Sequence, residues 1–399
     1  MSKPVVALFG GGPACLIAAF FLADTFEVHL YEKGKSIGRK FLVAGKGGFN
    51  LTNSATGDSL KEAYSYHPNL SGALNEFDST ATRAWLKDLG TDTFVGSSGR
   101  VFPEKEIKPA FVLTKIKEAL IKKGVHMHLN HEFIGFSEEL IPLISFNNET
   151  KKVVANHYVF GLGGGSWSKT GSNSKWLTYF SALGIKTIPF QASNCGIELN
   201  WDPIFREKFN GTPLKNIAIK ADKNWRKGEI LVTSCGFEGN AIYPSVPEIR
   251  QQLMKGQETE IHIDFKPNNS VDDLLKKAAQ SGLKSADYGK VFKVERVVIE
   301  LIKAILTKSE FTDPKCFSKT LKMATFKVNS LRPLDEAIST VGGIAMEEVT
   351  MAFTSVKFPQ FSFVGEMLDW DAPTGGYLLQ GCFTTGCVAA NRIIDQFKN

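Results

Sequence analysis

The chain has 399 residues, of which 43% are hydrophobic and 22% charged, which is typical of a folded globular protein with about two or three domains. Its net charge of +6 comes from charges scattered along the sequence, without a basic stripe interleaved with aromatic residues, so we expect no nucleic-acid partner. The uninterrupted apolar runs are too short to cross a bilayer, and the six cysteines form no CxxC pair. We therefore expect a cytoplasmic protein with reduced thiols and no membrane contact.

The beginning of the sequence predicts a nucleotide-binding βαβ unit. Residues 4–9 have the apolar character of a buried strand, residues 10–13 (Gly-Gly-Gly-Pro) predict a tight turn, and residues 14–23 predict an apolar helix. A second strand is expected at 28–31 and ends in Glu32, twenty positions after the last glycine of the turn. This order of strand, glycine turn, helix and acidic residue is typical of a site for the adenosine half of a dinucleotide.

Each residue type in this unit has a physical role at such a site. Gly10 permits a sharp reversal from strand to helix, and Gly12 has no Cβ atom, so a pyrophosphate can approach the backbone. The helix that begins near Pro13 directs unpaired N–H groups and the positive end of its dipole at that anion. Glu32 can accept hydrogen bonds from a ribose diol. Cys15 stands at the third glycine position of the fingerprint, and its larger side chain is expected to move the helix slightly away from the strand.

A second glycine-rich segment, residues 34–53, follows directly. Its glycines allow close backbone approach, its cations can neutralise phosphate, and its short polar side chains offer donors and acceptors. We expect it to hold the phosphate and ribityl part of a cofactor, and a plain surface loop is the alternative. The residues concerned are Arg39, Lys40, Gly45, Lys46, Gly47, Gly48, Asn50, Thr52 and Asn53.

The next part of the chain alternates between helical and strand patterns. Amphipathic spacing predicts the helices, and alternation of apolar and polar residues predicts the strands. The expected elements are helices over 80–90 and 107–123, a loop over 96–103, strands over 125–129 and from 134 onward, and a hairpin around Asn147-Asn148 with arms 141–146 and 153–162.

Two further glycine-rich segments predict contacts with the same cofactor. A strand runs into Gly163-Gly164-Gly165, which would let a dinucleotide lie across the strand ends; a second, independent nucleotide site is the alternative. Near the end, Gly375 and Gly376 precede a helix expected from about 382 to 397. The amino end of this helix would stabilise the negative charge of a reduced flavin, and a simple packing helix is the alternative.

Two clusters resemble reactive sites. Cys382 and Cys387 have the spacing of a flavin-linked redox disulfide, but five residues on a regular helix turn the side chains about 140° apart, so we expect free thiols. His126 and His128 share one face of a predicted strand, and His131 follows. Apart from Glu132, no ligand pattern accompanies them, so we expect surface histidines and no metal site.

The character of the sequence changes near residue 190 and returns to glycine-rich strand and turn near residue 334. We expect an inserted substrate domain in this stretch and a nucleotide-binding domain made from both flanking parts. The expected boundaries are 1–189 and 335–399 for the nucleotide-binding domain and 190–334 for the insertion, with a β-rich part over 190–267 and about 322–334 and a helical cap over 268–321.

The chain resembles the BaiN-like family of bacterial NAD(P)/FAD-dependent oxidoreductases, in the flavoprotein subgroup that carries AGKGG. The resemblance rests on VALFGGGPACLIAA, GRKFLVAGKGGFNLTN, GRVFP, GGGSWSKTGS, GEILVTSCGFEGNAIY, RPLDEAISTVGGIAMEEV and GEMLDWDAPTGGYLLQGCFTTG, which span nearly the whole chain. It implies FAD at the first βαβ unit and an α/β fold with an FAD-binding Rossmann-like domain of the glutathione-reductase type, an inserted β-rich domain and a helical cap.

The resemblance also implies which residues hold the FAD. The ADP half would contact Gly10, Gly12, Pro13, Ala14 and Glu32. The phosphate and flavin side would be lined by Lys33, Lys40, Gly45, Lys46, Asn50 and Thr52. The ribose would pass near Gly163 and Gly164, and the ribityl chain and flavin would contact Gly365, Glu366, Asp369, Gly376 and Tyr377.

We therefore expect an FAD-dependent oxidoreductase that transfers a hydride between flavin N5 and a small organic substrate. Oxygen as electron partner would make it an oxidase, and NAD(P)H as a transient electron donor would make it a reductase. No catalytic side chain stands out, because hydride transfer to a flavin needs positioning more than a protein acid or base. The alternatives are a flavin-binding redox sensor or accessory protein without turnover, and a protein that binds a nucleotide for structure only. The oligomeric state stays open.

Overall fold

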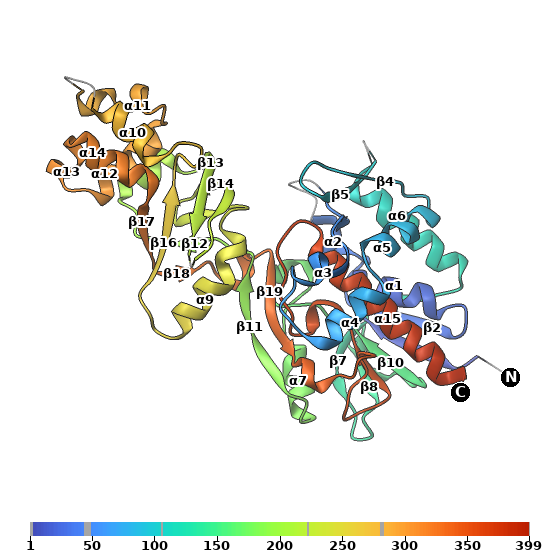
Figure 1. Cartoon of the computed structure of the whole chain (residues 1–399). Helices are drawn as coiled ribbons and strands as arrows, with labels where there is room; N and C mark the ends of the chain where they lie inside the picture. The colour runs from blue at the N-terminus through green and yellow to red at the C-terminus, as the bar shows by residue number, and fades with distance from the viewer. Residues whose placement is uncertain (1–2, 44–48, 105–106, 222, 280–282, 399) are drawn as a thin grey trace. The chain divides into compact units, whose positions relative to one another are not determined.

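The computed structural model describes residues 3–43, 49–104, 107–221, 223–279 and 283–398. The chain divides into two compact units, one made of Met1–Gln191 with Ser339–Asn399 and the other of Ala192–Ile338. The helices and strands of both units are labelled in Figure 1. Each unit has its own hydrophobic core. The second unit therefore interrupts the first in sequence, and the role toward substrate expected for the insertion stays a prediction.

A five-stranded parallel sheet forms the centre of the first unit. Its strand order is β20-β10-β1-β2-β6, and each neighbouring pair is parallel. The strands β1 and β10 are buried on both faces, which explains their nearly continuous apolar sequences. The α/β Rossmann-like fold predicted from the sequence is confirmed. The strands are β1 (Val5–Phe9), β2 (Glu27–Glu32), β6 (His126–Leu129), β10 (His157–Phe160) and β20 (Phe361–Phe363).

Two helices from distant parts of the chain pack together, α1 (Pro13–Leu22) and α15 (Tyr377–Lys398), and α1 also contacts β1 and β2 of this sheet. A Cβ atom at Gly386 of α15 would overlap the Ala14 carbonyl oxygen and lie 2.7 Å from Ile17 Cγ2, so glycine permits this close approach. The helix α15 begins at Tyr377, earlier than the predicted 382, because the turn is completed by Gly375 and Gly376, whose φ angles are 106° and 102°.

The predicted hairpin has a different second arm. The turn lies at Asn147 and Asn148, as expected, with φ angles of 52° and 64°. It joins β8 (Pro142–Phe146) to β9 (Glu149–Lys152), and β7 (Glu132–Phe136) pairs on the other side of β8. The predicted arm 153–162 is wrong, because β9 has four exposed polar residues without apolar alternation and the following apolar run belongs to β10.

The remaining elements of the first unit are short. The loop predicted over 96–103 is partly wrong, because Val101 and Pro103 are buried in a strand that pairs with two others. The strands are β3 (Thr52–Asn53), β4 (Thr93–Val95), β5 (Arg100–Pro103), β11 (Thr187–Ser193) and β19 (Ser339–Ile344). The helices are α2 (Arg39–Val43), α3 (Gly57–Lys61), α4 (Pro68–Glu76), α5 (Ser79–Asp88), α6 (Pro109–Lys122) and α7 (Trp176–Ala182).

The second unit combines a seven-stranded sheet with a group of helices. The strand order is β17-β16-β13-β14-β15-β12-β18, and the pairs are antiparallel. The strands are β12 (Ile197–Glu198), β13 (Thr212–Lys220), β14 (Arg226–Val232), β15 (Gly236–Glu238), β16 (Thr259–Asp264), β17 (Ala324–Val328) and β18 (Ser330–Leu331). The helices are α8 (Pro203–Phe209), α9 (Val246–Met254), α10 (Val271–Ala278), α11 (Tyr288–Val291), α12 (Arg296–Ile305), α13 (Lys308–Thr312) and α14 (Pro314–Lys322). Of the helices in the described ranges, none combines the length and the apolar character needed to span a membrane.

A buried histidine in the central sheet predicts a pH-dependent stability. His157 of β10 is 1% exposed, its Nε2 lies 2.9 Å from Ser362 Oγ of β20, and burial lowers its pKa from 6.5 to about 4. The unfolded chain therefore binds a proton at pH 5 that the folded chain does not, and the free energy of unfolding should fall by about 2 kcal/mol from pH 7 to pH 5 through this residue. Urea denaturation of wild type and His157→Gln at both pH values checks this: the variant should lack that part of the loss, and equal losses would contradict it.

Candidate cofactor site

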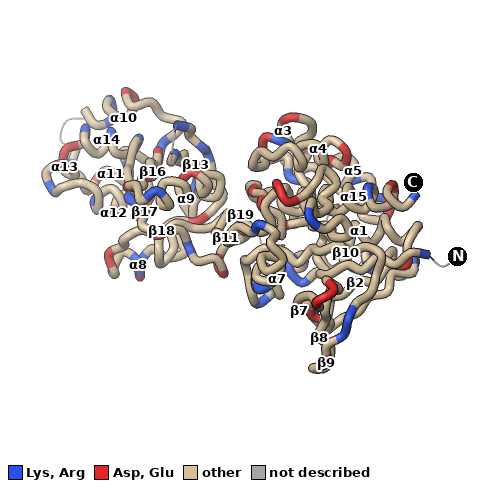
Figure 2. Tube along the Cα trace, turned by 90° about the horizontal axis from the view of Figure 1, so that it is seen from below, with Lys and Arg blue, Asp and Glu red and all other residues tan. Residues whose placement is uncertain are grey.

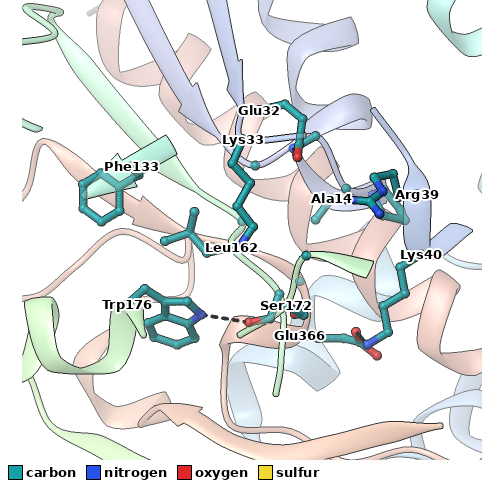
Figure 3. A pocket seen from close by; sticks show the side chains of 18 of the residues that line it. Ala14, Glu32, Lys33, Arg39, Lys40, Phe133, Leu162, Ser172, Trp176 and Glu366 are labelled. Carbon is teal, nitrogen blue, oxygen red and sulfur yellow. Dashed lines mark hydrogen bonds and ion pairs between the residues drawn. The ribbon is translucent and has the colours of Figure 1, made fainter. Parts of the chain in front are cut away.

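A cavity with about 1070 Å³ of space, its open mouth included, lies at the carboxyl ends of β1, β2 and β10 in the first unit (Figure 3). In an open parallel sheet this is the edge at which ligands bind. The cavity is lined by the turn Gly10–Ala14, the end of β2 from Tyr31 to Lys33, the segment Gly161–Gly163 and the segment Val364–Glu366. Stretches from the first, middle and last parts of the chain therefore meet around one space.

The glycine turn has the geometry of an anion-binding loop. Gly10 has a φ angle of +108°, and a Cβ atom there would overlap the Gly161 carbonyl oxygen and lie 2.9 Å from its carbonyl carbon. At Gly12, by contrast, a Cβ atom would meet nothing within 4 Å. Since α1 begins at Pro13, the free space beside Gly12 lies next to the unpaired N–H groups of its first turn.

Glu32 connects the end of β2 to the turn. Its Oε2 accepts a hydrogen bond of 2.6 Å from the Gly11 N–H, and its Oε1 accepts one of 2.7 Å from the Gly34 N–H. These two bonds hold the carboxylate at the wall of the cavity. A carboxylate has about four acceptor positions, so lone pairs remain for hydroxyl groups of a ligand.

One side of the cavity is charged and the other is apolar, as Figure 3 shows. On the charged side, Lys40 Nζ donates to Ser166 Oγ at 2.8 Å and forms an ion pair of 2.9 Å with Glu366. Burial lowers the pKa of Lys33, which also lines the cavity. On the apolar side lie the side chains of Phe133, Leu162, Trp176 and Tyr179.

Cys15 fits the third position of the fingerprint because the facing residue is also glycine. A Cβ atom at Gly161 would lie 2.5 Å from the Cys15 sulfur, so the missing side chain after β10 provides the space that the thiol needs. The thiol is fully buried and donates to the Phe9 carbonyl at 3.6 Å, and burial raises its pKa. It is therefore a packing residue.

Many of the residues predicted to hold the cofactor lie together at this cavity. The ones that line it are Gly10, Gly12, Pro13, Ala14, Glu32, Lys33, Lys40, Gly163, Gly365 and Glu366. Gly45 and Lys46 lie outside the described residues. The contact of each residue with a cofactor stays a prediction.

The other predicted residues have partners around the cavity. Thr52 Oγ1 donates to Gln380 Oε1 at 2.6 Å, Asp369 Oδ1 accepts from the Gly342 N–H at 2.9 Å, and the Tyr377 carbonyl accepts from the Tyr64 hydroxyl at 2.6 Å. Gly164 packs against Thr340, and Gly376 packs against Thr52 so closely that Cβ atoms at either glycine would overlap these neighbours. These five positions do not line the cavity.

Asn50 differs from this group. It does not line the cavity either, and its Oδ1 atom is buried without a hydrogen-bond partner among the described residues. A buried acceptor of this kind costs free energy unless another group satisfies it.

Two residues that hold Gly163 and Gly164 in place were not predicted from the sequence. Trp176 Nε1 donates to the Gly163 carbonyl at 3.2 Å, and Ser172 Oγ donates to the Gly164 carbonyl at 2.5 Å. Both lie within 13 residues of these glycines, and both line the cavity. The available signal was the polar run that follows the three glycines, because Ser172 and Trp176 both lie within eleven positions of Gly165.

The two clusters weighed in the sequence have different outcomes. Cys382 and Cys387 lie in the continuous helix α15 and are free and buried, as expected, and burial raises the pKa of Cys387 to about 12. The histidines gain a partner that the sequence did not reveal, because the parallel register places His29 of β2 opposite His126 of β6.

The comparisons with known proteins agree with this architecture. Residues 4–392 match the family model described as HI0933-like protein Rossmann domain. The chain is 21% identical to the 3-dehydro-bile acid delta(4,6)-reductase of Clostridium scindens, over 98% of this chain and 99% of that protein. It is 23% identical to the ribosomal RNA dihydrouridine synthase of Haemophilus influenzae, over 98% of each protein.

Among solved structures, the open conformation of a flavocytochrome c3 fumarate reductase matches with a TM-score of 0.51 and 12% identity, over 100% of this chain and 79% of that one. At this identity the match supports the fold alone. The family resemblance seen in the sequence motifs is confirmed by the family match. The chain belongs to the HI0933-like Rossmann domain family.

Proposed function

We propose that the protein is an FAD-dependent oxidoreductase that reduces a carbon–carbon double bond conjugated to a carbonyl group. The observation that supports the dinucleotide most directly is the open space at Gly12, beside the first turn of α1 and near the Glu32 carboxylate. A pyrophosphate would receive N–H hydrogen bonds there, and a ribose diol would donate to Glu32.

The rest of the cavity fits the other half of FAD. The Lys40–Glu366 ion pair and Gly365 line the charged side. We propose that these groups hold the phosphate, ribityl chain and flavin. When bound, FAD would supply hydride transfer at its N5 atom. The protein's contribution is to fix the position of this atom against the substrate.

The proposed substrate class is supported by the names of two relatives, because both names describe the reduction of a carbon–carbon double bond. A delta(4,6)-reductase acting on a 3-dehydro-bile acid saturates a double bond conjugated to a ketone. A dihydrouridine synthase saturates the uracil double bond that is conjugated to a ring carbonyl. For this protein we propose that a hydride would add to the alkene carbon farther from the carbonyl group, the electron pair would move toward the carbonyl oxygen, and a proton from water would add to the nearer carbon. NAD(P)H is the donor that we propose for the hydride.

Between these two kinds of substrate, the charge distribution favours a small molecule. Basic and acidic residues both occur throughout each unit, as Figure 2 shows, and the net charge of the whole chain is only +6. A protein that binds a folded RNA concentrates positive charge on one face, because phosphate contacts supply much of its affinity. We therefore expect a small-molecule substrate, and the second experiment includes RNA to test this expectation.

The first experiment tests the cofactor and the electron donor. The purified protein should be yellow, with absorbance bands near ~370 and ~450 nm, as expected of an oxidised flavin. Anaerobic addition of NADH or NADPH should bleach the ~450 nm band. A colourless protein that stays colourless after incubation with excess FAD would contradict the FAD proposal. A yellow protein reduced by amines but not by NAD(P)H would support the oxidase instead.

The second experiment tests the substrate class. The reduced protein is mixed anaerobically with a conjugated enone, with uridine-containing RNA and, as a control, with the corresponding saturated ketone. Reoxidation of the flavin by the enone supports our proposal. Reoxidation by RNA alone would assign the protein to RNA reduction. If neither reoxidises it, the reductase proposal is wrong, and a flavin-binding sensor is the better description.

A further inference from the structure

The edge of the parallel sheet carries a group of side chains that the cofactor cavity does not use. The strands β2 and β6 are parallel, and their register pairs His29 with His126 and Tyr31 with His128. Paired residues on neighbouring strands project from the same face of a sheet, and so does Glu27, two positions before His29. Two imidazoles and one carboxylate are therefore brought together by tertiary structure, although the histidines are 97 positions apart in sequence.

We propose that Glu27, His29 and His126 form a surface binding site for one divalent transition-metal ion, with Zn²⁺ as the best match. One ligand atom from each residue lies within 4.8 Å of the other two. His29 Nε2 and Glu27 Oε1 are 3.0 Å apart. Ligand atoms at the ordinary Zn²⁺ distances are about 3.4 Å apart in a tetrahedron, so side-chain adjustments of roughly 1 Å complete the site.

The ligand types select among metals. Imidazole nitrogen suits Zn²⁺, Ni²⁺ and Cu²⁺, whereas Mg²⁺ and Ca²⁺ prefer oxygen ligands. Two histidines and one glutamate also form the protein ligands of known zinc sites that keep a fourth position for water. The Glu27 side chain is 46% exposed and the His29 side chain 22%, so water can reach the fourth position.

A neighbouring histidine orients the central ligand. His29 Nδ1 lies 2.9 Å from His128 Nε2, which leaves His29 Nε2 directed toward Glu27. When His29 binds a metal through Nε2, its Nδ1 carries the proton and donates a hydrogen bond to His128 Nε2. Metal-bound histidines regularly make such a hydrogen bond through their second nitrogen, because it fixes the tautomer and the ring orientation.

Ring stacking restricts the same side chains further. The His29 and His126 rings are stacked with centroids 4.7 Å apart, and the His29 and His128 rings with centroids 5.2 Å apart. The Tyr31 ring stacks on His128 at 4.6 Å. These contacts hold the rings in place without a metal. Because an imidazole lone pair lies in its ring plane, the His29 and His126 rings would rotate out of this stack to direct one nitrogen each at the ion.

The position of the site separates it from the cofactor cavity. Glu27 begins β2 and Glu32 ends it, so the proposed metal lies about 17 Å along the strand from the nucleotide end of the cavity. The ion would link the edge strand β6 to β2. The site does not depend on the proposed function, because none of its three ligands lines the cavity.

Titration calorimetry tests the site on the full-length protein without a histidine tag, after treatment with a chelator. Zn²⁺ should bind at about one ion per chain, and Mg²⁺ should give no heat of binding. His126→Asn and Glu27→Gln should each weaken Zn²⁺ binding by about 100-fold, because each removes one of three ligands. His262→Asn, a half-buried histidine of the second unit that bonds to Thr325, is the matched control and should bind Zn²⁺ like the wild type.

Circular dichroism and urea denaturation show whether each variant is folded. Glu27→Gln changes an exposed side chain, so it keeps the test valid even if a histidine variant misfolds. No stoichiometric Zn²⁺ binding by the wild type would overturn the proposal. Wild-type affinity in both ligand variants, or an equal loss in His262→Asn, would also overturn it.

Discussion

Gly12→Ala is expected to weaken FAD binding by at least about 100-fold while the apoprotein keeps its stability. The Cβ atom would project into open space, with no atom within 4 Å, and the φ angle of −84° at Gly12 is allowed for alanine. Exchanging glycine for alanine at the residue before a helix changes the free energy of unfolding by less than about 1 kcal/mol. A bound pyrophosphate, however, would need the same space as the new methyl group.

Gly10→Ala is the contrasting variant. Its Cβ atom would overlap the Gly161 carbonyl oxygen, and the φ angle of +108° is unfavourable for alanine, so we expect a loss of about 3 kcal/mol or more in stability. Urea denaturation of the apoproteins and fluorescence titration with FAD measure both quantities. Wild-type FAD affinity in Gly12→Ala would mean that no pyrophosphate lies against this turn.

Gln380→Leu is expected to reduce the free energy of unfolding by about 3 to 5 kcal/mol. Gln380 is fully buried in α15 and has four hydrogen-bonding partners. Its Oε1 accepts from Thr52 Oγ1 at 2.6 Å and from Thr82 Oγ1 at 2.9 Å. Its Nε2 donates to the Phe77 carbonyl at 3.1 Å and to Thr384 Oγ1 at 3.0 Å. Leucine has a similar volume, so the loss would come from unsatisfied polar groups and not from a cavity.

Thr384→Ser is the control for this network. Serine keeps the hydroxyl that bonds to the Phe77 carbonyl, so the variant should lose only about 1 kcal/mol for one buried methyl group. Urea denaturation of the three proteins at pH 7 gives the comparison. If Gln380→Leu were no less stable than Thr384→Ser, the network would contribute little to the fold.

The local parts of the fold could be predicted from the sequence. The first βαβ unit follows from apolar runs, a glycine turn and one acidic residue within about 30 positions, and these signals do not depend on the rest of the chain. The second arm of the hairpin could not be predicted in this way. The exposed strand β9 contains only polar residues, and its pairing with β8 is decided by the Asn147-Asn148 turn and not by apolar alternation.

The non-local parts of the site needed the structure. Tyr158 of β10 pairs with Phe361 of β20, about two hundred positions away, and nothing near either residue predicts that pairing. The same holds for His29 and His126, which the sequence separates and the sheet register joins. Glycine positions such as Gly161 could be predicted only in part. The glycine is visible in the sequence, but its contact with Cys15 is not.

The arrangement of the central sheet has a consequence for the order of synthesis. The strand β2 ends at Glu32, but β20 is made only from Phe361 onward, and it carries the chain to the cavity wall at Gly365. At ribosomal speeds of about 5 to 20 residues per second, the first βαβ unit waits between about 15 and 65 seconds for the strand that completes its sheet. During that interval one edge of the nascent sheet lacks its neighbour, so a nucleotide can be enclosed only after translation of the final strand.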